Sequence, residues 1–268
     1  MILKIDSVEH MTRMRTIGAS LLRALASAYP LILIAVVWEA VARAGLVRPV
    51  FLPPLSTVIA QLVPLAKDGE VVAPLAISLY RTAAGLAIAV TAGVCFGLLM
   101  ARIRLVRWLL DPLIAFSFPS PKVAFLPVFI LWFGIDHLSK IALVAFTCVF
   151  PFIIAAYAGA TTVPTHQLWA ARAMGTSSRG LLLRVIFPAS LPSLMSGVRV
   201  GVPYALVSTF TAEMIAGGGG LGGELVLAQR YFETPSVFVY LLVMLAAGYV
   251  IDMGVLRLRA RVLRWHEE

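Results

Sequence analysis

Six long apolar segments constrain the fold of this chain more than any other feature of its sequence. Each approaches or exceeds the roughly 20 residues that a helix needs to cross about 30 Å of hydrocarbon. A helix also satisfies its own backbone hydrogen bonds where no water can do so. The pattern predicts an all-α polytopic membrane protein with about six transmembrane helices. The segments lie near residues 28–46, 73–101, 109–133, 141–160, 191–215 and 236–256.

Composition supports the same class. Hydrophobic residues make up 60% of the chain and charged residues 13%, against roughly 45–50% and 25% in soluble domains. The 268 residues hold six spans with short connections, so one transmembrane domain over 29–258 is expected between an N-terminal segment, 1–28, and a C-terminal tail, 259–268.

Cys95 and Cys148 lie in apolar runs without metal-type spacing, so no metal site is predicted.

The basic residues predict which side of the membrane each connection faces. Four lie in 1–28, three in 102–107, three in 166–184 and four in 257–264, whereas Arg81 and most of the others are assigned to outer connections. By the positive-inside rule both termini are cytoplasmic. The net charge of +9 is therefore explained by patches beside the spans, and no nucleic-acid partner is predicted.

The third apolar segment contains four prolines, at positions 112, 119, 121 and 127. Each proline removes a backbone donor, so this helix should be bent or locally unwound. Irregular backbone at membrane depth must face protein or a water-filled path. Pro119 and Pro121 are therefore candidate residues of a pathway or gate.

Glu213 lies within the fifth apolar segment, where an ionisable group is a functional candidate by default. Its place near the outer end of that segment also allows a hydrogen bond to nearby glycine amides. The glycine run 217–223 is expected to form a flexible turn, with Gly217 and Gly218 as candidate gate residues. The run contains G-x-G-x-x-G but follows a transmembrane helix rather than a strand, so a nucleotide site is not expected.

Catalytic motifs are absent from the sequence. It contains no P-loop, no H-E-x-x-H and no G-x-S-x-G, so no catalytic residue is assigned and ATP hydrolysis would need another subunit. An ion-coupled secondary transporter with Glu213 as proton carrier is the leading alternative. That alternative leaves the connection between the fourth and fifth segments unexplained.

This connection, about 163–188, has the composition of a helical elbow at the cytoplasmic surface. Alanines leave only small side chains on one helix face, Gly175 permits a turn, and arginines hold the element at the membrane surface. Such an element can fill a groove in a partner. The candidate docking residues are Trp169, Ala170, Ala171, Arg172, Gly175, Arg179 and Pro188.

The elbow resembles the cytoplasmic signature of binding-protein-dependent ABC importer permeases, written E-A-A, three residues, G, nine residues, I-x-L-P. Ala170-Ala171, Gly175 and Pro188 fall at this spacing, whereas Trp169 replaces the leading glutamate. Further motifs make the chain similar to the alkanesulfonate, taurine and nitrate importer permeases of type I. They are Phe51-Leu52-Pro53-Pro54, Ser78-Leu79-Tyr80-Arg81, Pro119-Ser120-Pro121, Leu126-Pro127, Leu131-Trp132-Phe133-Gly134-Ile135 and Ala212-Glu213-Met214.

The resemblance implies the transmembrane permease subunit of an importer in a bacterial inner membrane. Two such subunits, expected to be a homodimer, would form the pathway for a small anionic or zwitterionic solute such as an alkanesulfonate, taurine or nitrate. Two cytoplasmic ATPase subunits would bind ATP and magnesium, and the elbow would be their coupling helix. A periplasmic or lipid-anchored solute-binding protein would deliver the solute, and this chain itself would bind no cofactor.

Overall fold

The computed structural model describes residues 29–117 and 119–264. The predicted cytoplasmic N-terminal segment, 1–28, and the end of the predicted tail lie outside these residues. The contacts divide the chain into two compact units, 1–63 and 64–268. Each unit is described by itself.

In the first unit, residues 29–43 are helical and contact the start of α2 (Leu55–Lys67). Trp38 donates its indole N–H to the carbonyl of Pro53 at 2.9 Å. The Glu39 carboxylate accepts the backbone N–H of Ser56 at 3.1 Å, at the helix end where backbone donors lack partners. Glu39 also pairs with Arg43, four residues later on the same helix, at 2.6 Å.

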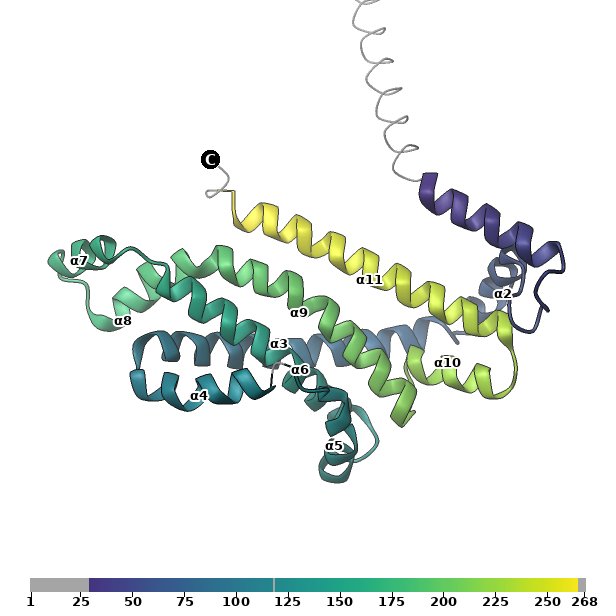
Figure 1. Cartoon of the computed structure of the whole chain (residues 1–268), viewed down its shortest axis with the longest axis horizontal. Helices are drawn as coiled ribbons and strands as arrows, with labels where there is room; N and C mark the ends of the chain where they lie inside the picture. The colour runs from purple at the N-terminus through teal and green to yellow at the C-terminus, as the bar shows by residue number, and fades with distance from the viewer. Residues whose placement is uncertain (1–28, 118, 265–268) are drawn as a thin grey trace, which may run out of the picture. The chain divides into compact units, whose positions relative to one another are not determined.

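The second unit is built from helices (Figure 1). Four of them are long and apolar enough to cross a membrane, which confirms a multi-pass membrane protein. The helices are α3 (Val72–Arg102), α4 (Arg104–Ser117), η1 (Lys122–Phe125), α5 (Leu126–Phe133), α6 (His137–Thr161), α7 (Thr165–Ala173), α8 (Ser178–Leu181), the π-helical turn η2 (Leu182–Ile186), α9 (Phe187–Ala216), α10 (Leu221–Arg230) and α11 (Thr234–Val262).

The third predicted span is broken, as its prolines predict. Its two halves, α4 and α5 with the preceding η1, differ in direction by 101°. Counted as one span, this bent pair brings the described spans to five. The remaining predicted span, 28–46, begins outside the described residues, so the total of six stays a prediction.

Helices α3, α6 and α9 pack along one another and form the centre of this unit. Glycines allow the close approach. A Cβ on Gly93 would lie 2.5 Å from the Cβ of Phe152, and one on Gly97 would lie 2.5 Å from the carbonyl oxygen of Ile153. Small residues at this i, i+4 spacing let helix backbones meet in lipid, where van der Waals packing drives association.

We expect Gly93→Ala to destabilise the protein by about 1–3 kcal/mol, because the added methyl overpacks the α3–α6 contact. Gly248→Ala in α11 is the matched control, since its Cβ would meet no atom within 4 Å. There alanine should be neutral or stabilise by about 0.5–1 kcal/mol. Thermal unfolding of the purified protein in mild detergent measures both. Equal unfolding temperatures for the two variants would contradict the assignment of the close contact.

Candidate functional site

A buried ion pair joins two of the central helices. Arg81 of α3 and Glu213 of α9 meet at 2.8 Å between Nη1 and Oε1, and their side chains are 1% and 0% exposed. Ser78, one turn before Arg81, donates its hydroxyl to Oε2 of Glu213 at 2.7 Å. Because charges removed from water are costly unless they are paired and hydrogen-bonded, both carboxylate oxygens need these partners.

The rest of the Arg81 guanidinium holds the loop that follows α9. Nη1 donates to the carbonyl of Gly219 at 2.8 Å, and Nη2 to that of Gly218 at 2.6 Å. Nε donates to Nδ1 of His137 at 3.2 Å, at the start of α6. A guanidinium presents five N–H donors in a rigid fork, so one side chain contacts three separate segments.

The start of α10 is tied to the same network. The backbone N–H of Gly222 donates to Oε2 of Glu213 at 3.1 Å, which confirms the predicted hydrogen bond between this carboxylate and a glycine amide. The N–H of Leu221 donates to the Ser78 hydroxyl at 2.9 Å. Ser78 therefore accepts from α10 while it donates to α9. The network joins α3, α9, α10 and the loop between the last two.

Residues 217–220 all adopt positive φ, from 65° to 90°. Four successive residues in this region require glycine, because a side chain there meets its own backbone. Gly220 has a second reason, since a Cβ at this position would overlap the Glu213 carboxylate. The predicted turn is present, and Gly218 contributes its carbonyl to it as an acceptor.

The assignment of Arg81 to an outer connection is wrong: Arg81 is 0% exposed within α3. The sequence contained evidence for its partner. Arg81 lies inside the predicted span 73–101 and Glu213 inside 191–215, and two opposite charges in apolar segments are expected to meet. The partners of Glu213 give it a structural role, because its carboxylate pairs with Arg81 and accepts from Ser78 and Gly222.

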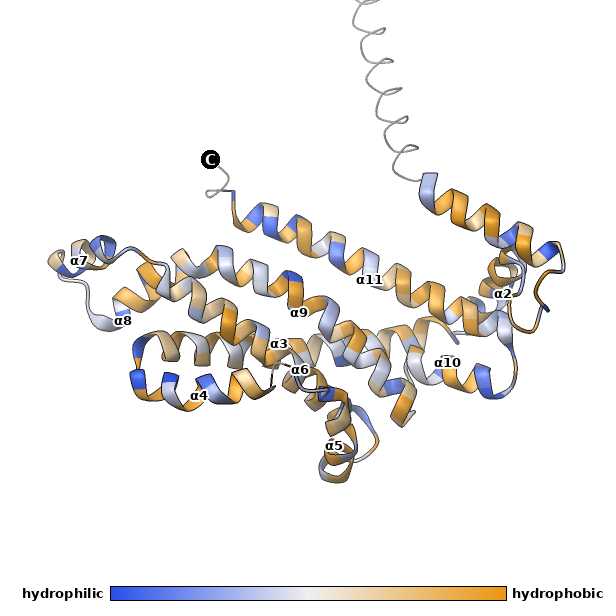
Figure 2. Ribbon diagram, viewed as in Figure 1, coloured by the Kyte–Doolittle hydropathy of each residue, from blue (hydrophilic) through white to orange (hydrophobic). Residues whose placement is uncertain are grey.

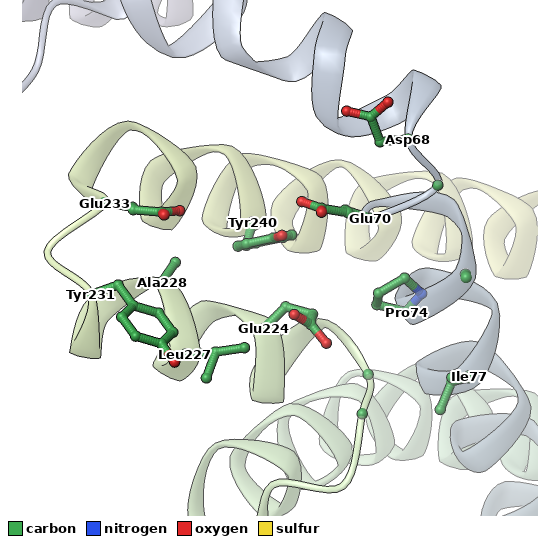
Figure 3. A pocket seen from close by; sticks show the side chains of 14 residues that line it. Asp68, Glu70, Pro74, Ile77, Glu224, Leu227, Ala228, Tyr231, Glu233 and Tyr240 are labelled. Carbon is green, nitrogen blue, oxygen red and sulfur yellow. The ribbon is translucent and has the colours of Figure 1, made fainter.

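A cavity of 540 Å³ is lined by residues at and just before the start of α3, by α10 and by the start of α11 (Figure 3). Four carboxylates surround it: Asp68, Glu70, Glu224 and Glu233. Burial raises the pKa of Glu224 above the usual 4.5, and the negative charge of Glu70 raises it further. Like charges and desolvation both favour the protonated form of a carboxyl.

The elbow residues lie on two short helices and the turns beside them. Trp169 is 66% exposed, whereas Ala171 is 5% exposed and packs with Leu181 and Ile186. Gly175 follows α7 with φ of 80°, the left-handed conformation common after helix ends. Of the other candidates, Ala170 and Arg172 lie in α7, Arg179 in α8 and Pro188 in α9. Pro119 and Pro121 lie at the break before η1.

With the broken span, the elbow and the buried network in place, comparison with known proteins assigns a family. The profile described as "Binding-protein-dependent transport system inner membrane component" matches residues 93–264, which is more than half of the chain. The chain belongs to this family. The fold class and the resemblance to importer permeases that the sequence predicts are therefore confirmed.

Two curated relatives cover nearly the whole chain. The taurine transport system permease protein TauC of Escherichia coli is 33% identical over 237 residues, 87% of this chain and 86% of its own length. The putative aliphatic sulfonates transport permease protein SsuC of Bacillus subtilis is 30% identical over 236 residues, 88% of this chain and 85% of its own length.

A solved structure has the same fold. An inward-facing structure of the MetNI methionine ABC transporter matches with a TM-score of 0.56 and 18% identity, over 72% of this chain and 94% of that one. At this identity the match supports the arrangement of helices alone.

We expect Glu213→Gln to lower the free energy of unfolding on the order of 3–5 kcal/mol, because it leaves the Arg81 charge buried without its counter-ion. Asp111→Asn is the matched control, since its pair with Arg107 is about half exposed at 3.2 Å and should contribute less than about 1 kcal/mol. Chemical unfolding in detergent measures both. Arg81→Met combined with Glu213→Met should recover part of the loss. A Glu213→Gln variant as stable as Asp111→Asn would contradict the structural role.

The cavity of Figure 3 predicts a pH dependence. The folded pKa of Glu224 is raised, so the folded state holds its proton more tightly than the unfolded state. The stability linked to this group is therefore greatest below the ordinary pKa and falls as pH rises through the raised value. As pH rises from about 4 to about 7, the unfolding temperature of the Glu224→Gln variant should increase relative to that of the unmodified chain. Glu70→Gln should make the loss of stability with rising pH smaller, because it removes one of the charges that raise the pKa of Glu224. Parallel curves of unfolding temperature against pH for all three proteins would refute this prediction.

Proposed function

We propose that the chain is the transmembrane subunit of an ATP-driven importer for taurine or an aliphatic sulfonate and forms the pathway for that solute. The observation that supports this most is the 33% identity to TauC over 87% of the chain. The SsuC similarity points to the same substrate class. The names of both relatives refer to short molecules with a sulfonate group.

The proposed assembly has a second copy of this chain, two cytoplasmic ATPase subunits and a solute-binding protein outside the membrane. The family description includes dependence on a binding protein, which supports the last partner. The sequence has no P-loop, so ATP and magnesium would be held by the ATPase subunits.

The arrangement of charge in residues 64–264 supports a cytoplasmic elbow and a cytoplasmic C-terminal end. Helices α4, α7 and α8 and the C-terminal end of α11, all of which carry arginines, lie toward one end of the second unit, and α10, which lines the acidic cavity, lies toward the other (Figure 2). By the positive-inside rule the arginine end faces the cytoplasm. The acidic cavity would then face the side on which a binding protein docks.

The elbow offers apolar side chains to a partner. Trp169, Met174 and Leu183 are 66%, 79% and 66% exposed. Beneath them, Ala171 and Leu181 are buried in a small core. An exposed aromatic on a packed base is typical of the anchors that contribute most to a protein interface. We assign Trp169 as the anchor of ATPase docking, in the position of the signature glutamate.

The function is tested by uptake of radiolabelled taurine into proteoliposomes that contain the chain with its ATPase, in the presence of the binding protein. Uptake that requires ATP inside the vesicle and binding protein outside supports the proposal. Uptake driven by a proton or sodium gradient without ATP favours the secondary transporter. Butanesulfonate as competitor distinguishes a general sulfonate importer from one restricted to taurine.

Trp169→Ala should reduce co-purification of the ATPase at least about tenfold, because loss of an interface anchor costs about 2 kcal/mol or more. Gly175→Pro should have the same effect, since proline cannot adopt the φ of 80° found here. Tyr249→Ala is the control, because Tyr249 is 68% exposed on α11, within a predicted span. Membrane insertion should be normal in all three. Full ATPase recovery with Trp169→Ala would refute the anchor assignment.

A further inference from the structure

Another cavity, of 480 Å³, lies between α6 and α9 beside the break in the third span. Its α6 wall comes from Thr147, Pro151, Ile154, Ala155 and Ala158. Its α9 wall comes from Ser193, Ser196, Gly197, Val200 and Tyr204. These positions recur every three or four residues, so each set forms a single face of its helix. Lys122 of η1 completes the lining.

Thr147 carries an unused hydrogen-bonding group in this lining. The residue is 9% exposed. Among the residues that the structure describes, its hydroxyl is the one buried side-chain oxygen that has no hydrogen-bond partner. Thr209, also buried, instead donates its hydroxyl to the carbonyl of Ala205 at 2.9 Å. A buried hydroxyl without a partner is costly and calls for an explanation such as a ligand.

The backbone beside this hydroxyl is also altered. Pro151 lies four residues after Thr147 in α6, and proline has no N–H to donate to the Thr147 carbonyl. Thr147 thus lines a cavity whose remaining α6 lining is apolar. Ser193, Ser196 and Tyr204 place hydroxyl-bearing side chains in the opposite wall, and the Ser196 hydroxyl donates to the carbonyl of Pro192 at 3.2 Å.

Among the described residues that line this cavity, Lys122 is the one with a charged side chain. The break after Pro121 positions it, since Lys122 begins η1 directly after that proline. Its ammonium lies 5.4 Å from the centre of the Phe150 ring, a cation–π contact. A cation in a partly buried, low-dielectric setting attracts an anion more strongly than it does in water.

We propose that this cavity holds the anionic group of the transported solute during passage, with Lys122 as counter-charge and the Thr147 hydroxyl as hydrogen-bond donor. The ligand class is a short organic anion, a sulfonate with a small aliphatic part that packs against Ile154 and Val200. The inference rests on the proposed import function and adds a site within the pathway. Pockets that bind small molecules typically combine apolar walls with a few polar groups in this way.

The charge of the site is tested by cysteine labelling of the assembled transporter. Ser196→Cys is introduced into a Cys95→Ser background, and the same background without it gives the blank for the buried Cys148. The probes are sulfonatoethyl methanethiosulfonate, an anion shaped like the proposed ligand, and its trimethylammonium counterpart. We expect Lys122→Gln to lower the ratio of anionic to cationic labelling rates by roughly an order of magnitude. Lys67→Gln, an exposed lysine of α2, should leave the ratio unchanged.

The hydroxyl is tested by uptake of radiolabelled taurine with binding protein and ATP. Thr147→Val keeps the shape of the side chain and should lower uptake about tenfold, whereas Thr147→Ser keeps the hydroxyl and should stay close to the unmodified rate. Thr91→Val is the matched control, because the exposed Thr91 donates to its own helix at 2.8 Å. Unchanged labelling ratios with Lys122→Gln, or full uptake with Thr147→Val, would overturn the site. A charge preference in labelling without any ATP-driven taurine uptake would overturn the proposed function and keep the anion site.

Discussion

The ion pair between Arg81 and Glu213 is the interaction on which the described second unit most depends. Inside a membrane protein the hydrophobic effect does little to choose among helix partners, because lipid is as apolar as the side chains. A buried guanidinium and a buried carboxylate remove that freedom, since each is costly without the other. Around them Ser78 and Gly222 complete the hydrogen bonds of the carboxylate. Residues 132 positions apart in the chain are thereby fixed side by side.

The glycine loop is a result of the same constraint. Arg81 needs acceptors for the N–H groups that Glu213 does not use, and the carbonyls of Gly218 and Gly219 provide them. Residues 217–220 adopt positive φ where the loop presents these carbonyls to Arg81. The loop is therefore ordered by charge, although its composition alone suggests flexibility. The glycines at the α3–α6 contact have a different role, which is to permit close packing.

The sequence predicts the elements of this protein well because they are local properties. Apolar length places α3, α6 and α11 within a few residues, and the prolines predict the break before η1. The partner of Glu213 is not predicted, because pairing across 132 residues depends on tertiary packing. The turn at Gly175 is predicted by its residue type. The π-helical turn Leu182–Ile186 is not predicted, since it depends on how α8 continues into α9. The unpartnered hydroxyl of Thr147 likewise has no sequence pattern of its own.

The helical stretch Ser178–Ala216 is continuous over 39 residues, a length on the order of 60 Å. It begins in the elbow and ends one turn beyond Glu213, so it acts as a single stiff rod between the two. A rod transmits rotation as well as displacement: turning its elbow end by a few degrees turns the carboxylate at the far end with it. The π turn near its start and the two prolines inside α9, Pro192 and Pro203, interrupt its regular hydrogen bonding. Torsion applied at the elbow would therefore be shared between these interruptions and the buried ion pair, and their relative stiffness would set how much rotation reaches the pair.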